Sequence, residues 1–324
     1  MLILLLCGFS QASGAPLQNP EPQAPIGTTG TTLRVGVTMV TVGARITDRN
    51  GREVRRLHAE DFSILENDVP QRISFFSEED QPVSLAILLD KSDSMGQGDK
   101  LVHAKTAAIF LEREGHPGNE FLYVPFDARA EVPSAFTTDR RSLELAIIGT
   151  SVGGGTSLYD AILAALERLS RARYPRQALV VITDGADQHS LHTLADLLAG
   201  VQASQAQVFL IGYFSPEEDL LFRTAREKVT RDDGMLIDNP RLVFSGLAEE
   251  SGAASFFPRS DDELRQAVEA IVDDLRHQYT LAYYPTSSSL SQDGGYRRIQ
   301  VRVRRRGVKV RARQGYRLDP QNVE

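Results

Sequence analysis

The chain is poor in cysteine and has no long apolar run. Its 324 residues include one cysteine, Cys7, so no disulfide can form within a single chain. No stretch approaches the roughly 20 consecutive apolar residues that a membrane-spanning helix needs. Hydrophobic residues make up 41% and charged residues 24% of the chain, which indicates a folded protein rather than a disordered one. The length allows one substantial α/β domain and a small companion unit.

Motifs of several enzyme classes are also missing. The sequence has no G-x-x-x-x-G-K-[ST] loop for nucleotides and no Ser-His-Asp arrangement around a nucleophile elbow. Ser92 stands two residues after Asp90, where enzymes that form an aspartyl phosphate have a second Asp. His189 and His192 have metal-like spacing without a third soft ligand, and we interpret them as polar loop residues. The sequence therefore predicts a protein that is not an enzyme, with metal-assisted phosphate or ester hydrolysis as an alternative.

Acidic residues are absent from a basic segment near the C-terminus. The net charge of the chain is −7, yet residues 296–318 contain ten Arg or Lys and no Asp or Glu. These basic residues alternate with apolar ones, which is typical of the solvated face of a β-hairpin. The alternative is contact with an acidic partner, an anionic lipid or a polysaccharide through Arg302, Arg304, Arg306, Lys309 and Arg311. Nucleic acid is not an expected partner, because no aromatic residues are interleaved for base stacking.

The N-terminal segment predicts export. Residues 1–15 read MLILLLCGFSQASGA, a short apolar stretch that ends in small residues and resembles a secretory signal peptide. We therefore expect a bacterial protein that is secreted or held in the periplasm or cell envelope. A lipid anchor on Cys7 and a misplaced gene start are the alternatives. Residues 16–32 are rich in Pro, Gly, Gln and Thr, which predicts a flexible leader.

Residues 33–82 have the short alternating stretches of a small β unit. Asp48-Arg49-Asn50-Gly51 and Asn67-Asp68 are typical of hairpin turns. The predicted strands are 35–42, 44–47, 62–66 and 71–76.

Residues 83–278 alternate between strands and helices, which predicts a doubly wound, mostly parallel sheet with helices on both faces. We expect buried strands at 83–89, 121–126, 178–182, 208–213 and 254–257, and an antiparallel edge strand at 131–136. Apolar residues at helical spacing predict helices at 101–114, 158–173, 191–202, 242–251 and 261–278.

The β pattern returns in residues 279–318. We expect strands at 279–284, 299–303 and 308–312, with a polar loop at 287–295 and a hairpin turn at Arg306-Gly307. Because these two β segments flank one α/β domain, we expect them to pack together as one sandwich.

Three loops carry oxygen-bearing side chains that suit a hard divalent cation. Asp90 ends a predicted strand, and Ser92 and Ser94 follow at alternate positions that point the same way. Thr156 comes after three glycines, and Asp184 ends a second strand. The carboxyl ends of parallel strands share one edge of a sheet, so these five side chains are expected to meet there. The alternative is that Asp90 and Asp184 cap the helices that follow them.

This set leaves one of the six positions around Mg²⁺ free. Because three of the five ligands are neutral hydroxyls, the ion keeps positive charge and attracts an oxyanion, such as an Asp or Glu carboxylate of a protein partner. Mg²⁺ is the expected ion, with Mn²⁺ or Ca²⁺ as alternatives. Asp93, Asp187 and Gly155 are expected to lie around the ligands without binding the ion.

The three loops resemble the metal-ion-dependent adhesion site of von Willebrand factor type A domains. The family pattern is D-x-S-x-S, a Thr from a second loop and an Asp from a third, in this order. The flanks resemble a bacterial group of secreted proteins related to these domains, through Asp48-Arg49-Asn50-Gly51, Glu60-Asp61-Phe62, Tyr283-Tyr284-Pro285 and Gln314-Gly315-Tyr316. Many members have Gly at the position of Asp93, so the site is more acidic here. The resemblance implies a non-enzymatic adhesion or protein-binding module, and a metal-stabilised structural component of an envelope assembly is the alternative.

Overall fold

The computed structural model describes residues 39–129, 135–185, 187–230, 234–286 and 295–317. The predicted signal peptide and leader lie outside these residues, as do most of the predicted edge strand 131–136 and most of loop 287–295. Within the described part of the chain, no helix combines the length and apolar character needed to cross a membrane.

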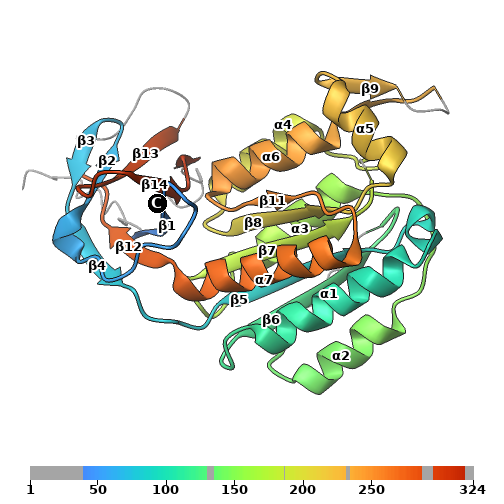
Figure 1. The fold of residues 1–324 in the computed structure, drawn as a ribbon, viewed down its shortest axis with the longest axis horizontal. Coiled ribbons are helices and arrows are strands. Elements are labelled where there is room, and N and C mark those ends of the chain that lie inside the picture. The colour runs from blue at the N-terminus through green and yellow to red at the C-terminus, as the bar shows by residue number, and fades with distance from the viewer. Residues whose placement is uncertain (1–38, 130–134, 186, 231–233, 287–294, 318–324) are drawn as a thin grey trace, which may run out of the picture. The chain divides into compact units, whose positions relative to one another are not determined.

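A parallel sheet of five strands lies at the centre of the α/β part (Figure 1). Its strand order is β11-β8-β7-β5-β6, and each neighbouring pair is parallel. All residues of β5 are buried, as expected for a strand covered on both faces. The doubly wound sheet predicted from the sequence is confirmed. Its strands are β5 (Ser84–Asp90), β6 (Glu120–Phe126), β7 (Gln177–Thr183), β8 (Gln207–Gly212) and β11 (Ser255–Phe256).

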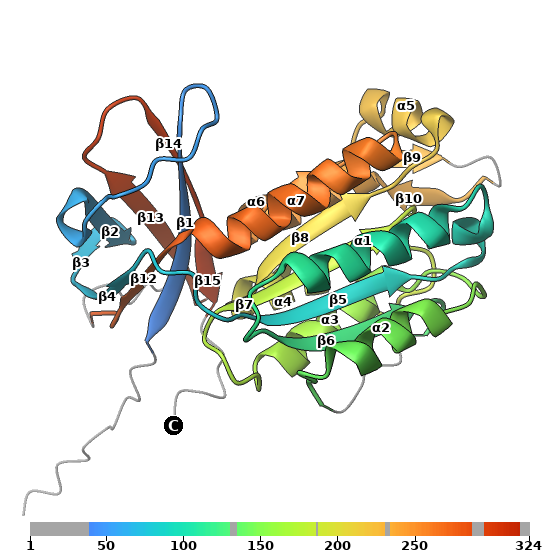
Figure 2. The same cartoon turned by 60° about the horizontal axis from the view of Figure 1, so that its bottom comes forward.

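Two hydrophobic cores cover the two faces of this sheet. Alternate residues of β5 take part in different cores, with Ala86 and Leu88 in one and Leu85 and Ile87 in the other. Helices α3, α4 and α6 pack in the first core, and α1, α2 and α7 pack in the second (Figure 2). The helices are α1 (Lys100–Glu114), α2 (Arg140–Gly149), α3 (Leu158–Leu169), α4 (Leu194–Ala203), α5 (Pro216–Thr224), α6 (Pro240–Ser251) and α7 (Asp261–His277).

The sequence analysis misses two helices and two strands of the α/β part, namely α2, α5, β9 (Lys228–Thr230) and β10 (Leu236–Asp238). It also misses the short strand at Gly315–Arg317 in the β unit. In α2 the exposed apolar residues Leu145 and Ile148 obscure the helical spacing of its buried positions. Helix α5 has a capping box and a proline in its first turn, which is a signal the sequence does carry. Directly after the predicted edge strand 131–136, Thr137 forms an antiparallel bridge with Phe121.

The two flanks of the chain form one all-β unit with two antiparallel sheets, as predicted. One sheet has the order β14-β1-β12-β4 and the other β15-β13-β2-β3, so both sheets mix strands from the N-terminal and C-terminal flanks. Phe62, Tyr279 and Leu281 lie in the shared core. The strands are β1 (Val40–Asp48), β2 (Phe62–Glu66), β3 (Val69–Gln71), β4 (Ile73–Ser77), β12 (Tyr279–Tyr283), β13 (Tyr296–Val303), β14 (Val308–Ala312) and β15 (Gly315–Arg317), and a short 3₁₀ helix covers Ala59–Asp61.

Three details of this unit differ from the prediction. The described part of 35–42 and the predicted strand 44–47 form one strand, β1. The predicted strand 71–76 is divided at Arg72, because β3 pairs with β2 whereas β4 pairs with β12 in the other sheet. Strands β13 and β14 are not a hairpin, since β13 pairs with β2 and β14 pairs with β1. Pairing with distant strands outweighs the local turn at Gly307.

The basic segment is therefore not a uniformly solvated face. Arg297 is buried in the β unit, where its Nη1 lies 3.2 Å from the carboxylate of the buried Glu66. Tyr283 and Tyr316 also donate hydroxyl hydrogen bonds to Glu66, at 2.6 and 2.9 Å. Burial without such partners would be costly for a carboxylate, so this network keeps Glu66 inside the core.

Helix α6 ends against the β unit at a glycine that no other residue can replace without strain. Gly252 has a φ of +78°, and a Cβ there would lie 2.3 Å from the backbone nitrogen of Arg313. We expect Gly252→Ala to lower the free energy of unfolding by about 2 kcal/mol or more, because the left-handed backbone and the close approach both oppose a side chain.

Chemical denaturation of Gly252→Ala and of a control variant in the same helix tests this expectation. Gly246 lies on the exposed side of α6, and a Cβ added there would meet nothing within 4 Å, so Gly246→Ala is the matched control. That control should stabilise the protein by about 0.5–1 kcal/mol, as alanine does in a helix interior. Equal effects of the two substitutions would contradict the role assigned to Gly252.

Candidate functional site

The predicted ligands lie at the carboxyl edge of the parallel sheet. Asp90 is the last residue of β5, and Asp184 directly follows β7. These strands are parallel neighbours, with Leu89 opposite Ile182, so the chain leaves the sheet from both at the same edge. The arrow of β5 points toward this edge in Figure 2. Local sequence thus supplies the acids, and strand pairing brings them together.

Hydrogen bonds join the first and third loops. The amide of Ser92 donates to one oxygen of Asp90 at 2.9 Å, and Oγ1 of Thr183 donates to the other at 2.5 Å. The hydroxyls of Ser92 and Ser94 are 3.1 Å apart, and Ser94 donates to Oδ1 of Asp184 at 2.8 Å. Ser94 lies in a 3₁₀ turn, η2 (Asp93–Gly96), that begins directly after Ser92. Four of the five predicted ligands are therefore in one connected polar cluster.

The glycine-rich loop is bonded to the first loop through its backbone. The amide of Gly153 donates to the carbonyl of Lys91 at 2.8 Å, and the amide of Asp93 donates to the carbonyl of Gly154 at 2.9 Å. This loop carries the fifth predicted ligand, Thr156, which is buried.

The same loop is also bonded to the third loop. The carbonyl of Thr156 accepts hydrogen bonds from the amides of Gln188 and His189, both at 3.0 Å. A Cβ on Gly155 would lie 2.3 Å from the ring of His189, so only glycine allows this approach. The three loops form one hydrogen-bonded assembly, and Gly155 lies within it beside His189.

The site holds two carboxylates away from water. Asp90 and Asp184 are both buried, and burial raises the pKa of Asp90 to about 6. The hydrogen bonds from Thr183 and Ser92 act in the opposite direction, and the nearby charge of Asp184 adds to the increase. Two buried acids side by side are stabilised by a cation, so this donor set fits a hard divalent ion.

Lys100 is a site residue that the sequence analysis missed. It is the first residue of α1, and its Nζ lies 2.6 Å from Oδ2 of Asp184. A second ammonium, that of Lys91, is paired with Asp127. No motif marks these lysines, because their pairing depends on how α1 and the strand ends are placed in the fold.

The predicted surrounding acids have different roles. Asp93 is exposed at the start of η2, and its backbone amide makes the contact with the glycine-rich loop. Asp187 accepts from the amide of Tyr159 at 3.1 Å and from the hydroxyl of Ser190 at 2.5 Å, so it caps α3. His192 lies 2.8 Å from Asp160 and takes no part in the cluster.

The basic residues predicted as a partner contact are not equivalent. Arg302, Arg304, Arg306 and Lys309 are exposed. Arg311 differs from these four residues, because its guanidinium is paired with the buried Asp274 of α7. The contact predicted for the basic segment therefore reduces to the four exposed residues.

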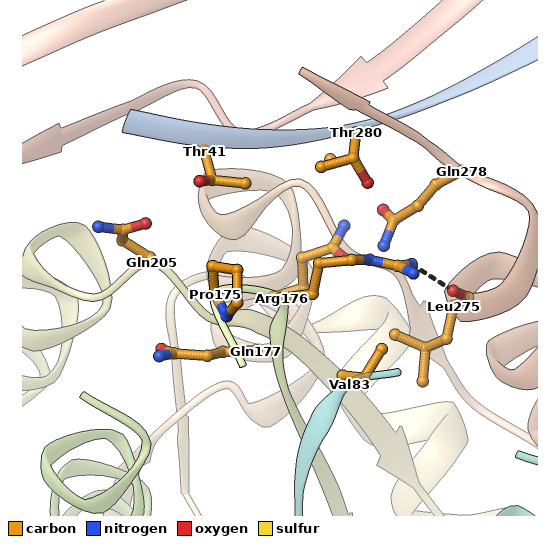
Figure 3. A pocket seen from close by; sticks show the side chains of 11 residues that line it. Thr41, Val83, Pro175, Arg176, Gln177, Gln205, Leu275, Gln278 and Thr280 are labelled. Carbon is orange, nitrogen blue, oxygen red and sulfur yellow. Dashed lines mark hydrogen bonds between the residues drawn. The ribbon is translucent and has the colours of Figure 1, made fainter. Parts of the chain in front are cut away.

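Two features outside the cluster are worth comparing with a binding site. Glu53, Asp273 and His277 have ligand atoms close together, but the guanidinium of Arg45 lies 2.5 Å from Asp273 and already neutralises it. A cavity of about 20 Å³ lies at the end of α7. Arg176 is among the side chains that line it (Figure 3). This volume has room for about one water molecule, so the cavity is too small for a ligand.

Comparisons with known proteins identify the central segment. Residues 85–186 match the family model described as the von Willebrand factor type A domain. No curated protein matches the chain.

Several solved structures are similar in fold. BatB from Bacteroides thetaiotaomicron is 20% identical over 60% of this chain and 97% of its own, with a TM-score of 0.45. An aerotolerance-related membrane protein from Bacteroides fragilis is 20% identical over 59% of this chain and 98% of its own, with a TM-score of 0.43. A von Willebrand factor type A protein from Catenulispora acidiphila is 12% identical over 82% of this chain and 75% of its own, with a TM-score of 0.47. The assignment of the central segment rests on the sequence match.

Proposed function

We propose that this chain binds a protein partner through a divalent metal ion, because residues 85–186 match the family model of the von Willebrand factor type A domain. Domains of this family are generally interaction modules without catalytic activity, which supports a binding role. The ion would be Mg²⁺, with Mn²⁺ or Ca²⁺ as alternatives. The residues that would hold it are Asp90, Ser92, Ser94, Thr156 and Asp184.

One observation carries this proposal: three loops from distant parts of the chain are hydrogen-bonded into a cluster around two buried carboxylates. The alternative, in which Asp90 and Asp184 only cap helices, does not explain why the three loops are bonded together. Helix capping would explain one acid, but Asp90 bonds to Ser92 and Thr183, and Asp184 bonds to Ser94 and Lys100. The cluster therefore fits a cation site better than two independent caps.

The partner would contribute a carboxylate of Asp or Glu. Mg²⁺ prefers six oxygen ligands, and the chain offers five side-chain oxygens. With only two acids among them, an ion that binds one acid through water keeps a net attraction for an anionic oxygen. Arg302, Arg304, Arg306 and Lys309 are exposed basic residues outside the ligand set, and we assign them to a secondary anionic contact.

Removing one neutral ligand tests the metal site without changing its charge. Thr156→Val keeps the buried shape of the side chain and removes its hydroxyl. We expect the affinity for Mg²⁺ or Mn²⁺, measured by isothermal titration calorimetry, to fall by about tenfold or more. Capture of partners from the native cell surface should fall in parallel, and EDTA should abolish it in the wild-type protein.

Ser190→Ala is a suitable control, because Ser190 bonds to Asp187 outside the ligand set. Metal binding should survive this substitution. If folded wild-type protein takes up neither Mg²⁺ nor Mn²⁺, the proposed site is wrong. If metal binds but capture is the same in EDTA, the site is structural, as in the alternative of a metal-stabilised envelope component.

The proposed location is outside the cytoplasm, either secreted or in the cell envelope. This proposal rests on residues 1–15, whose sequence resembles a signal peptide, and a lipid anchor at Cys7 remains the lesser alternative. Cell fractionation with detection of the mature N-terminus tests it. Recovery of the uncleaved chain in the cytoplasm would contradict export.

A further inference from the structure

Lys100 is the one side chain among the described residues of the site that brings a positive charge to a predicted ligand. Its Nζ lies 2.6 Å from Oδ2 of Asp184, while Oδ1 of Asp184 accepts from Ser94 at 2.8 Å. The side chain of Asp184 is 1% exposed and that of Lys100 is 14% exposed, so this ion pair is largely shielded from solvent. Both oxygens of Asp184 are therefore engaged, one of them by a cation.

The position of Lys100 is set by the fold on both sides of it. Met95 in η2 and Leu101 in α1 are buried in the same hydrophobic core. Between them the chain turns through left-handed conformations at Gly98 and Asp99, with φ of +56° and +60°. This turn starts α1 directly beside the end of β7. The ammonium thus reaches Asp184 from a constrained backbone rather than from a mobile tail.

Electrostatics sets this ammonium and a divalent ion in competition for Asp184. Both are attracted to the same carboxylate, and two positive charges within about 4 Å repel strongly where water is excluded. We propose that Lys100 is a built-in competitor of the metal: it neutralises Asp184 in the metal-free protein and must leave when a divalent ion binds. This inference rests on the proposed function.

Two consequences follow for the site. The metal-free cluster stays assembled, because Lys100 offsets part of the repulsion between Asp184 and Asp90. Metal affinity is lower than the five oxygens alone would provide, since binding must break an ion pair that is shielded from solvent. The site therefore needs a higher concentration of divalent ion for occupancy than it would need without Lys100.

Neighbouring lysines provide the comparison. Lys91 is paired with Asp127, which is outside the ligand set. Lys105 lies one turn further along α1, where its Nζ donates to the carbonyl of Ile148 at 2.8 Å. Lys105→Met therefore removes a lysine from the same helix without touching the cluster, and serves as the matched control.

The first experiment measures metal affinity directly. Calorimetric titration with Mn²⁺ should show about tenfold tighter binding for Lys100→Met than for the wild-type protein, and no change for Lys105→Met. Thermal unfolding in EDTA should show a lower Tm for Lys100→Met only. Lys100→Gln keeps a hydrogen-bond donor without the charge, so it gives the same test if the methionine variant does not fold.

The second experiment follows the ammonium itself. Amine-reactive labelling read by mass spectrometry should modify Lys100 slowly in EDTA and faster in saturating Mg²⁺, because the ion releases it into solvent. Labelling of Lys105 should be independent of metal.

The outcomes separate this inference from the proposed function. Equal or weaker Mn²⁺ binding by both Lys100 variants, or labelling of Lys100 that metal does not change, overturns the competitor role while leaving the metal site intact. A failure of every variant and of the wild-type protein to bind metal overturns both.

Discussion

Asp90→Asn is expected to abolish divalent metal binding while leaving the fold intact. The amide has the size of the carboxylate, so it can still accept the hydrogen bond from the amide of Ser92 and can bond to Thr183. It lacks the negative charge that a hard cation needs, and we expect the affinity for Mn²⁺ to fall more than about 100-fold. Because burial raises the pKa of Asp90, removing its charge should not destabilise the metal-free protein.

Calorimetry with Mn²⁺ and thermal unfolding in EDTA measure the two parts of this expectation. Asp93→Asn is the matched control, since Asp93 lies in the same loop but its side chain is exposed. The control should bind metal with an affinity close to that of the wild-type protein. Metal-dependent stabilisation that persists in Asp90→Asn would show that the ion binds elsewhere.

Asp274→Asn is expected to cause a large loss of stability. The carboxylate of Asp274 on α7 lies between Arg45 of β1, at 3.3 Å, and Arg311 of β14. Its side chain is 4% exposed, so the substitution leaves two guanidinium groups beside a buried neutral amide. Breaking a buried ion pair in this way costs about 3–5 kcal/mol. Burial raises the pKa of Asp274 even though both guanidinium groups act in the opposite direction, so desolvation offsets part of what the ion pairs contribute. Because both arginines are also partly exposed, we expect a decrease at the lower end of this range, about 3 kcal/mol.

Urea denaturation measures the loss, and Asp273→Asn is the control. Asp273 also pairs with Arg45, at 2.5 Å, but its side chain is 43% exposed. Asp273→Asn should therefore cost less than about 1 kcal/mol, as is usual for ion pairs near the surface. Similar losses for both variants would mean that burial of Asp274 does not determine the strength of this connection between α7 and the β unit.

Local sequence was sufficient to predict much of the α/β part. Buried strands such as β5 and β7 are short continuous apolar runs, and their ends are marked by Asp90 and Asp184. The D-x-S-x-S spacing and the glycines before Thr156 predicted three loops at one sheet edge, and the structure brings these loops together. Helix α2 was missed because its exposed apolar residues Leu145 and Ile148 obscure the helical spacing of its buried positions.

Strand pairing in the β unit was less accessible from the sequence. The alternation in β13 and β14 is correct for strands, yet alternation alone does not specify a partner. Each strand pairs with a segment more than 200 residues away, as in the pairs Val301 with Ile64 and Val310 with Ile46. A hairpin at Gly307 is the nearest arrangement along the chain, but the shared core favours two sheets.

The sequence by itself determined most of the strands and helices, the three oxygen-bearing loops and the similarity of the central segment to von Willebrand factor type A domains. These features depend on residue identity at short spacing. Only the tertiary structure decided that Lys100 pairs with Asp184 and that Arg311 pairs with Asp274. Such ion pairs join side chains that are distant in the chain, and their strength depends on burial, which no local pattern encodes. The ammonium of Lys100 is therefore placed at the candidate metal site by the tertiary fold and not by a local sequence motif.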